Sequence, residues 1–565
     1  MSERPIVRGS LREHLDHLPV TLGFGTSGRR GLVKDLTPLE VYINALGELE
    51  FLKTLASDQG GIREGDVFFL AADLRPSSTL PALPGGGEIA QVILRAIQDA
   101  GLVPCYLGKI PTPALAAFAM GKGKGSIMVT GSHIPFDRNG YKTNTSIGEL
   151  LKHHELPIAE HVGRVRERIY SSSIEASPFN PSGCFKESLL QLPDPDRGAS
   201  RAYVQRYLEF MDPDALKGLR VVFYEHSAVG RDLVPEILRA LGAEVLCCGR
   251  SDTFVPIDTE NIDADCLDSM RALVLEASES MERVDALIST DGDSDRPLIL
   301  AIDPKNGALR FFGGDLIGMI SSKFLSPDAI VVPISCNDGI DRSELAPLVT
   351  EKTRIGSPYV IDGMMRAMAM GRQYVVGWEA NGGFLVGTEL QRNGRRLSPL
   401  PTRDAVLPIL AVLASAVESA CPVSTLFDQL PPRYGKSALL RNFPRERSHR
   451  LLKCFAPPDG FEGVLNLDEP SLAPELEELH RFIVMHFTRD EGFGRPLSLD
   501  YTDGVRISFE GGDVAHLRAS GNADELRIYA IADTRERAET IADSGVREPG
   551  GILRCLEKHT LERSN

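Results

Sequence analysis

Apolar residues recur along the chain in a pattern that predicts alternating strands and helices. Residues 67–78, 216–249 and 328–348 each begin with a short apolar run that ends in a turn. In the second of these segments, Leu and Ile recur at helical spacing between Leu233 and Leu241, which predicts an amphipathic helix. We expect a helix after the strand in the third segment as well. Repeated strand–turn–helix units indicate parallel sheets covered by helices, with functional loops at the carboxyl ends of the strands.

The last part of the chain has a different pattern. Residues 501–533 alternate apolar and polar side chains between Gly-containing turns, which is typical of antiparallel strands. We therefore expect an α/β protein with three consecutive α/β mixed-sheet domains and a smaller C-terminal α+β domain. Residues 171–200 and 420–436 are rich in turn-forming residues and are predicted linkers. The predicted domains span residues 1–200, 201–312, 313–425 and 426–565.

Composition and charge exclude several classes of protein. The 565 residues are 42% hydrophobic and 25% charged, which are globular values. The chain has 62 Lys and Arg and 78 Asp and Glu, so its formal charge is −16. We therefore expect neither nucleic acid nor a membrane as a partner. The most apolar segment, residues 405–417, is shorter than the ~18–20 residues of a membrane span and predicts a buried helix. Nine Cys without a CxxC pair, and a first segment without a signal-like apolar region, favour a cytoplasmic location.

An acidic loop between two apolar strands carries the strongest chemical signal. Asp291, Asp293 and Asp295 alternate with Gly292 and Ser294. Three carboxylates on one curled loop repel one another without a counter-ion, and their oxygens suit Mg²⁺ or Ca²⁺. The loop lacks the longer spacing and the distal Glu of an EF-hand. We therefore expect a metal site here, with a hydrogen-bonded turn as the alternative.

Three further loops carry residues that suit phosphate and sugar chemistry, each weakly when taken alone. Ser132 and His133 follow an apolar strand on a Gly-flanked turn, a composition that also occurs in ordinary turns. Glu379 and Asn381 lie on a Gly-rich loop and suit vicinal hydroxyls, although a hairpin turn explains them equally well. The last loop combines a guanidinium, a hydroxyl and turn amides, which together suit a phosphate. Its residues are Arg518, Ser520, Gly521 and Asn522.

The order and spacing of these loops resemble the α-D-phosphohexomutase superfamily over nearly the whole chain. GFGTSGRRG (residues 23–31) is similar to the opening FGTSGxRG, TGSHIP (130–135) is similar to the phosphoserine loop TASHNP, and DGDSDR (291–296) matches the metal loop DGDxDR. WEANGG (378–383) occupies the slot of the sugar loop, and RASGNADELRIY (518–529) that of the phosphate loop RPSGTEPKLRVY. The resemblance implies four domains around a central cleft, with one loop from each.

The resemblance also implies a Mg²⁺-dependent phosphomannomutase/phosphoglucomutase. Such an isomerase interconverts hexose 6-phosphate and hexose 1-phosphate through a phosphoserine and a bisphosphorylated sugar, so its partners are hexose phosphates and the hexose bisphosphate. The protein would be a monomer or a homodimer. The implied catalytic residues are Ser132, His133, Lys142 and Arg30. The implied metal ligands are Asp291, Asp293, Asp295 and Ser132. The implied substrate-binding residues are Arg296, Glu379, Asn381, Arg518, Ser520, Gly521 and Asn522.

Departures from the family patterns blur the identity of the sugar more than the reaction. Gly383 replaces a frequent His, Asp524 adds a negative charge near the phosphate loop, and Ser357 stands where some mannose/glucose-type members carry a His. A phosphoglucosamine or N-acetylglucosamine-phosphate mutase is therefore the alternative with the same chemistry. A non-catalytic sugar-phosphate-binding relative and a metal-dependent phosphatase are the alternatives from other classes. The presence of Ser132 and the Asp triplet weighs against the non-catalytic relative, and the phosphatase would leave the phosphate loop without a role.

Overall fold

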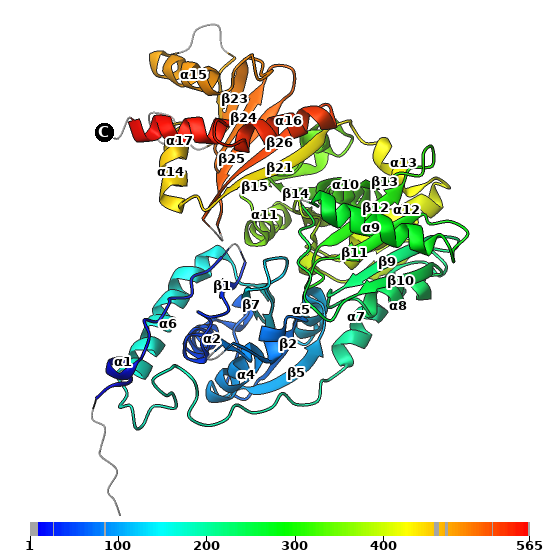
Figure 1. The fold of residues 1–565 in the computed structure, drawn as a ribbon. Coiled ribbons are helices and arrows are strands. Elements are labelled where there is room, and N and C mark those ends of the chain that lie inside the picture. Colours follow the sequence, from blue (N-terminus) through cyan, green and yellow to red (C-terminus); the bar gives the residue numbers. More distant parts are fainter. Residues whose placement is uncertain are drawn as a thin grey trace, which may run out of the picture.

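Among the described residues, four sheets of five or six strands follow one another along the chain, and each is covered by helices (Figure 1). We call each of these sheets with its helices a domain and number the domains I to IV from the N-terminus, so that domain I is blue to cyan and domain IV yellow to red in Figure 1. The computed structural model describes residues 9–25, 27–83, 86–260, 262–456, 463–468, 473–521 and 524–562. Three α/β domains followed by a smaller α+β domain are the predicted fold class, which is confirmed.

Domain I contains a mixed sheet in the order β1-β7-β6-β2-β5, with β8 paired to β7. β2, β5 and β6 run parallel, whereas β7 is antiparallel to both β6 and β1. Its strands are β1 (Arg29–Leu32), β2 (Val67–Ala72), β3 (Pro81–Leu83), β4 (Gly86–Gly87), β5 (Val103–Lys109), β6 (Ser126–Val129), β7 (Arg138–Thr145) and β8 (Gly148–Glu149). Its helices are α1 (Leu11–His14), α2 (Pro38–Leu52), α3 (Pro76–Thr79), α4 (Ile89–Asp99), α5 (Thr112–Gly121) and α6 (Glu155–Tyr170).

Domains II and III share one scheme, in which three parallel strands are extended by antiparallel ones. The orders are β10-β9-β11-β12-β13 and β15-β14-β16-β17-β20. Domain II consists of α7 (Gly198–Phe210), β9 (Arg220–His226), α8 (Leu233–Ala240), β10 (Glu244–Arg250), α9 (Ala264–Ala277), β11 (Ala286–Thr290), β12 (Pro297–Ile302) and β13 (Leu309–Phe311). Domain III consists of α10 (Gly314–Leu325), β14 (Ala329–Pro333), β15 (Val349–Thr353), α11 (Ser357–Ala369), β16 (Val375–Trp378), β17 (Phe384–Val386), β18 (Leu390–Arg392), β19 (Arg395–Leu397), β20 (Leu400–Asp404), α12 (Val406–Glu418) and α13 (Val423–Asp428).

Domain IV is built on an antiparallel sheet in the order β21-β26-β25-β24-β23-β22. Its strands are β21 (Tyr434–Arg441), β22 (Val464–Asn466), β23 (Pro496–Asp500), β24 (Val505–Phe509), β25 (Val514–Ala519) and β26 (Glu525–Ala532). Its helices are α14 (Arg445–Lys453), α15 (Pro474–His486), α16 (Arg535–Val546) and α17 (Ile552–Glu562).

One continuous apolar core joins the first three domains. It contains Phe69 of domain I, Phe223 of domain II and Trp378 of domain III. Helix α7 lies at this junction, where it contacts α5 and β19. Domain IV has a separate core around Phe455 and Ile483. Three of the four predicted site loops therefore belong to one packed body, and the fourth reaches the cleft on a domain attached after α13.

The prediction of a helix directly after the strand in residues 328–348 is wrong. β14 is followed by two 3-10 turns, Asp338–Arg342 and Ala346–Leu348, and then by β15. Pro347 has no N–H, and its ring clashes with the preceding turn of an α-helix. The predicted helices that contain Leu233 and residues 405–417 are confirmed as α8 and α12.

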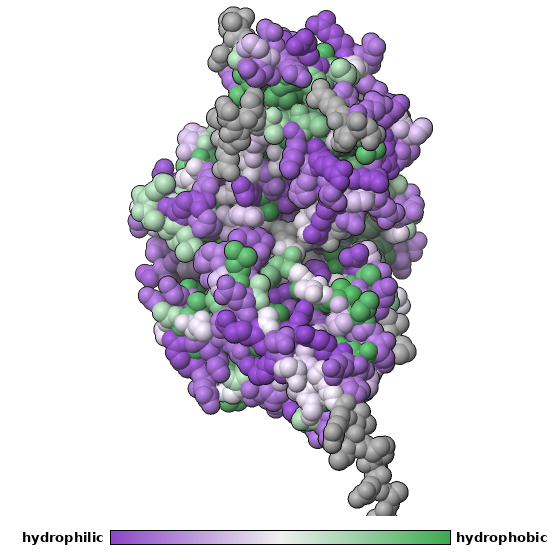
Figure 2. Space-filling model, turned by 90° about the vertical axis from the view of Figure 1, so that its left-hand side faces the viewer, coloured by the Kyte–Doolittle hydropathy of each residue, from purple (hydrophilic) through white to green (hydrophobic). Residues whose placement is uncertain are grey.

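Within the stretches that the structure describes, no helix is both long enough and apolar enough to cross a bilayer. Figure 2 shows a mostly hydrophilic face on which hydrophobic residues are interspersed. Single exposed apolar side chains of this kind are normal for globular proteins.

Candidate active site

The acidic loop, residues 291–296, connects β11 to β12, and residues 291–295 are buried. The side chains of Asp291, Asp293 and Asp295 are 0% exposed. Ser294 has a φ of 56°, in the left-handed region, which curls the loop. A Cβ on Gly292 would lie 2.7 Å from the carbonyl oxygen of Ser132. Glycine at this position therefore lets the acidic loop of domain II lie directly against the serine loop of domain I.

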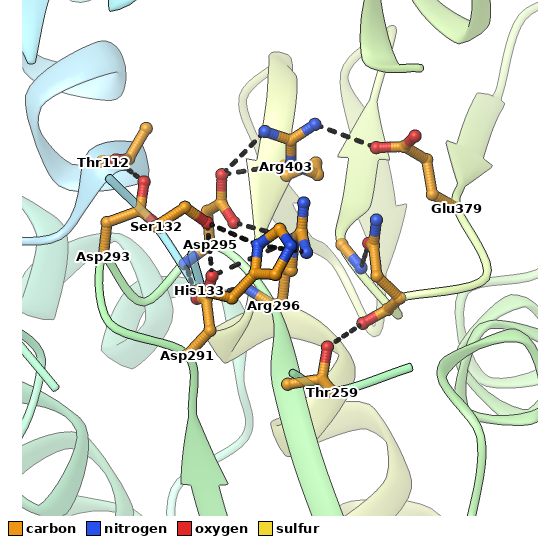
Figure 3. A network of polar contacts seen from close by, with 12 residues as sticks. Thr112, Ser132, His133, Thr259, Asp291, Asp293, Asp295, Arg296, Glu379 and Arg403 are labelled. Carbon is orange, nitrogen blue, oxygen red and sulfur yellow. Dashed lines mark hydrogen bonds and ion pairs between the residues drawn. The ribbon is translucent and has the colours of Figure 1, made fainter. Parts of the chain in front are cut away.

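Ser132 follows β6 and points its hydroxyl at the acidic loop (Figure 3). Its Oγ donates a hydrogen bond of 2.7 Å to Oδ2 of Asp291. Its φ of 54° is unusual for a non-glycine residue, and such strained conformations concentrate at functional sites. Burial, together with the carboxylates of Asp293 and Asp295, raises the pKa of Asp291 well above its usual range. The loop thus holds more negative charge than its surroundings fully neutralise.

The donor set of this loop fits a hard cation. One carboxylate oxygen of each Asp lies within 4.8 Å of the corresponding oxygens of the other two. Oδ1 of Asp293 and Oδ1 of Asp295 are buried and have no hydrogen-bond partner among the described residues. Unpartnered, converging carboxylate oxygens are the ligands that Mg²⁺ takes in proteins. Asp291, Asp293, Asp295 and the Ser132 hydroxyl therefore form a suitable ligand set.

Two domain I side chains hold the other oxygens of the acidic loop. Nζ of Lys142, on β7, lies 2.8 Å from Oδ2 of Asp293 and 2.7 Å from Oδ2 of Asp295. Thr112, at the start of α5, donates its hydroxyl to Oδ2 of Asp293 at 2.6 Å and its N–H to the Asp293 carbonyl at 3.0 Å. Although burial opposes it, Lys142 and Thr112 lower the pKa of Asp293 below its usual range. The sequence analysis missed Thr112; the signal was a helix start, PTP, directly after a parallel strand.

The remaining predicted catalytic residues, His133 and Arg30, line one pocket together with Ser132. Nδ1 of His133 accepts a hydrogen bond of 2.8 Å from Nη1 of Arg296. Burial and the charge of Arg296 lower the pKa of His133 well below its usual range, so the imidazole is neutral. Burial also lowers the pKa of Arg30, to about 10, with a further contribution from the nearby cation Arg75.

The loop after β16 meets the acidic loop through a buried arginine that sequence reasoning did not select. Arg403 on β20 donates from Nε to Oδ2 of Asp295 at 3.0 Å and from Nη1 to Oε2 of Glu379 at 2.9 Å (Figure 3). Oδ1 of Asn381 accepts a hydrogen bond from the N–H of Gly383 at 2.9 Å, and its carbonyl accepts one from Thr259 at 2.9 Å. Asn381 thus shapes its own turn as well as lining the pocket. The signal for Arg403 was its position in RDA, where the family has KDG.

Domain IV contributes two guanidinium groups to the pocket. Arg518 on β25 and Arg527 on β26 are directly opposite each other in the strand register. Nε of Arg518 donates to Oδ2 of Asp503 at 3.0 Å. Nη2 of Arg527 donates to Oε2 of Glu525 at 3.1 Å. Two opposed guanidinium groups that line one pocket suit an anion there in addition to these carboxylate partners. Arg527 was missed although it stands in the LRIY part of the motif; Asn522 lies outside the described residues.

One pocket collects these groups from all four domains. The predicted residues that line it are Arg30, Ser132, His133, Arg296, Glu379, Asn381, Arg518, Ser520 and Gly521. Lys142 and the three aspartates lie buried beside it rather than on its wall. The lining residues that sequence reasoning missed are Ser27, Asp258, Glu260, Arg403, Arg527 and Tyr529. Asp258 and Glu260 lie in a loop after β10 that carries no motif.

A hydroxyl that points at a loop of carboxylates suited to a cation, with two guanidinium groups of a separate domain in the same pocket, is an arrangement that suits phosphoryl transfer on a small phosphorylated substrate. Four family models match the chain in order: phosphoglucomutase/phosphomannomutase alpha/beta/alpha domain I at residues 21–168, domain II at 201–305, domain III at 313–434, and the C-terminal domain at 476–547. The chain belongs to the phosphoglucomutase/phosphomannomutase family of the α-D-phosphohexomutase superfamily. The predicted enzyme class, a phosphohexomutase isomerase, is confirmed.

Relatives of known name and structure agree with this assignment. A phosphomannomutase of Sinorhizobium fredii is 36% identical over 523 residues, which are 93% of this chain and 98% of the relative. A phosphomannomutase of Salmonella muenchen is 37% identical over 525 residues, 93% of this chain and 94% of the relative. A phosphoglucosamine mutase of Symbiobacterium thermophilum is 30% identical over 416 residues, 71% of this chain and 80% of the relative.

The fold itself is shared with solved structures. A phosphoglucomutase/phosphomannomutase family protein from Burkholderia thailandensis superposes with a TM-score of 0.61 at 17% identity, covering 95% of this chain and 97% of that one. An N-acetylphosphoglucosamine mutase from Aspergillus fumigatus, in complex with glucose 1,6-bisphosphate, gives a TM-score of 0.52 at 16% identity, covering 96% of this chain and 99% of that one.

Proposed function

We propose that this chain is a Mg²⁺-dependent mutase that interconverts hexose 6-phosphate and hexose 1-phosphate, with mannose or glucose as the sugar. The observation that carries the proposal is the contact of Ser132 with Asp291 at 2.7 Å, in a pocket that also holds Arg518 and Arg527 of another domain. A site with a phosphoryl donor at one end and an anion clamp at the other suits a substrate that carries two phosphates during turnover. The curated relatives of highest identity named above are phosphomannomutases.

In this proposal the phosphoryl group moves between Oγ of Ser132 and a sugar hydroxyl. The bond from phosphorus to Oγ breaks as the bond to the sugar oxygen forms, and the hydroxyl proton passes to a base. Lys142 is the candidate base, because it is buried beside the serine loop and the acidic loop; its Nζ contacts Asp293 and Asp295 here, and it would accept the proton in its neutral form. Arg30 and His133 line the pocket next to Ser132 and would hold oxygens of the transferring group.

Asp291, Asp293, Asp295 and the Ser132 oxygen would hold the Mg²⁺. When bound, the ion supplies positive charge that stabilises the negative charge on the transferring phosphoryl group. The chain already places compensating charge at the same loop, since Lys142 contacts Asp293 and Asp295, and Arg403 contacts the same Oδ2 of Asp295.

The sugar and the second phosphate would bind across domains III and IV. Glu379 offers a carboxylate that can accept hydrogen bonds from adjacent sugar hydroxyls, next to Asn381 on the same loop. Arg296, Arg518, Ser520, Gly521 and Asn522 are the proposed remaining contacts, with Arg527 beside them. The proposed domain boundaries, at residues 200, 312 and 425, assign one loop to each domain, although the first falls within α7 and the last within α13.

A coupled assay with the phosphates of mannose, glucose and glucosamine tests the proposal. We expect interconversion of the mannose or the glucose phosphates in the presence of Mg²⁺, and a loss of activity in excess chelator that added Mg²⁺ reverses. A clear preference for glucosamine phosphate would assign the alternative sugar class. Absence of turnover with all three phosphorylated sugars would contradict a mutase function and support a non-catalytic sugar-phosphate-binding protein.

A further inference from the structure

Glu149 joins domain I to domain III next to the pocket. It lies on β8, where it pairs with Asn144 at the edge of the domain I sheet. Its Oε2 accepts a hydrogen bond of 2.7 Å from Ser357, at the start of α11, and its Oε1 accepts one of 2.5 Å from Thr402 on β20. Both hydroxyls belong to domain III and are buried. No motif or family pattern in the sequence singled out Glu149.

The contact with Ser357 sets the direction of the serine hydroxyl. A serine hydroxyl has one donor and two acceptor lone pairs. Because an ionised Glu149 has no proton to donate, the Ser357 hydroxyl must donate its only hydrogen to Oε2. Its lone pairs are then available to Arg403, whose Nη1 donates to the Ser357 oxygen at 3.1 Å. Glu149 therefore makes Ser357 an acceptor for Arg403.

Arg403 is a buried cation that lies between the acidic loop and Glu379. It is 3% exposed and contacts Asp295 of the acidic loop with Nε and Nη2, both at 3.0 Å. Its Nη1 is divided between Glu379 at 2.9 Å and Ser357 at 3.1 Å. The second of these contacts fixes the plane of the guanidinium, and the charge of Glu149 adds to the charges of Asp295 and Glu379 that raise the pKa of Arg403.

We infer that Glu149 is a positioning residue, which acts through Ser357 to orient Arg403 between the acidic loop and the loop that carries Glu379. Docking of domain I on domain III then sets the geometry of a buried cation that two site loops share. Thr402, the residue before Arg403, also donates a hydrogen bond to the Glu149 carboxylate, so that Glu149 contacts β20 directly. The inference rests on the proposed function only in its kinetic part.

The kinetic test is a double-mutant cycle on the full chain. Glu149→Gln keeps the size of the side chain but turns one acceptor oxygen into an N–H₂ donor, and Ser357→Ala removes the relay. Since charge-assisted hydrogen bonds are at stake, each single variant should lower kcat/KM roughly tenfold, mainly through kcat. The kcat/KM of the double variant should be no lower than that of the less active single variant. Glu155→Gln is the matched control, because Glu155 is a nearby half-exposed carboxylate whose ion-pair partner is Lys152.

Hydrogen–deuterium exchange provides a second readout that needs no turnover. In Glu149→Gln and in Ser357→Ala, amides of residues 379–383 and 400–404 should exchange faster than in the wild-type protein, while those of β9 should be unchanged. Kinetics of Glu149→Gln equal to those of Glu155→Gln, or losses that multiply in the double variant, would overturn the inference. If the wild-type protein fails to turn over hexose phosphates, the proposed function fails, and unchanged exchange at residues 379–383 would then overturn this inference separately.

Discussion

The hydroxyl of Ser132 donates a hydrogen bond of 2.7 Å to Asp291 across the boundary between domains I and II. Lys142 and Thr112 cross the same boundary to Asp293 of the same loop. The candidate phosphoryl donor and the candidate metal ligands therefore come together only when the two domains are docked. The continuous core beneath domains I to III keeps them docked.

Removal of one charge from the acidic loop should weaken the metal site. Asp293→Asn keeps one oxygen but loses the negative charge and presents an N–H₂ group toward Lys142 or Thr112. We expect the Mg²⁺ concentration for half-maximal activity to rise roughly tenfold or more, since even residues behind the metal ligands change affinity by about 10–100-fold. A Mg²⁺ titration of activity measures this shift. Asp265→Asn, at an exposed position of α9, is the control; equal titration curves for the two variants would contradict the assignment.

The C-terminal domain should act as a phosphate clamp. Arg518→Ala removes one of two opposed guanidinium groups, and a charge-assisted hydrogen bond contributes ~1.5–3 kcal/mol. We expect kcat/KM for sugar phosphates to fall roughly ten- to a few-hundred-fold. Hydrolysis of the phosphoserine by water, which needs no second phosphate in place, should change much less.

The comparison of the two reactions separates a clamp from a structural role. Arg489→Ala, at an exposed position of the same domain, should leave both rates unchanged. Equal losses in both reactions of Arg518→Ala would mean that Arg518 supports the fold or the metal loop, and no loss in either would place the phosphate elsewhere.

Acid should destabilise domain IV through His486, a buried histidine. Burial and the neighbouring His559 lower the pKa of His486 to about 4, and the two rings lie 5.3 Å apart. The unfolded chain binds a proton at this histidine near pH 6.5, whereas the folded domain does so only near pH 4, so stability falls as pH decreases between these values. The effect is at most about 3 kcal/mol.

Calorimetric unfolding between pH 7.5 and pH 4.5 measures this loss. His486→Phe should make the unfolding of domain IV less dependent on pH over that range. His449→Gln, at an exposed position of α14, should retain the wild-type dependence. An unchanged pH dependence in His486→Phe would show that the acid sensitivity arises from other groups.

Local patterns predicted the elements better than the contacts between them. The apolar runs that became β11, β12 and α12 are continuous in sequence, and each specifies its structure through its own periodicity. The prediction of a helix after β14 was wrong because Pro347 interrupts the segment. This local signal was given less weight than the repeated strand–turn–helix pattern. Trp378 of the sugar-loop motif is part of the core, since it is 1% exposed and lies parallel to Phe384.

The site was predicted where residues cluster in a motif and missed where they meet only through the fold. Asp291, Asp293 and Asp295 lie within five residues, so the sequence of one loop is enough to identify them as a cluster. Thr112 and Arg403 contact the same aspartates from 181 and 108 residues away. Nothing in the local chemistry of a threonine at a helix start, or of an arginine on an edge strand, reveals such a partner.

The measurement that tests the central claim most directly is the location and fate of a phosphate on the protein. Intact-mass and peptide analysis of the purified chain should find phosphate on Ser132, and addition of a hexose monophosphate should transfer that phosphate to the sugar. Ser132→Ala should fold normally, as judged by its thermal unfolding, yet lose several orders of magnitude in turnover. A phosphate on a different residue that passes to the sugar, or near-normal turnover in Ser132→Ala, would contradict the account.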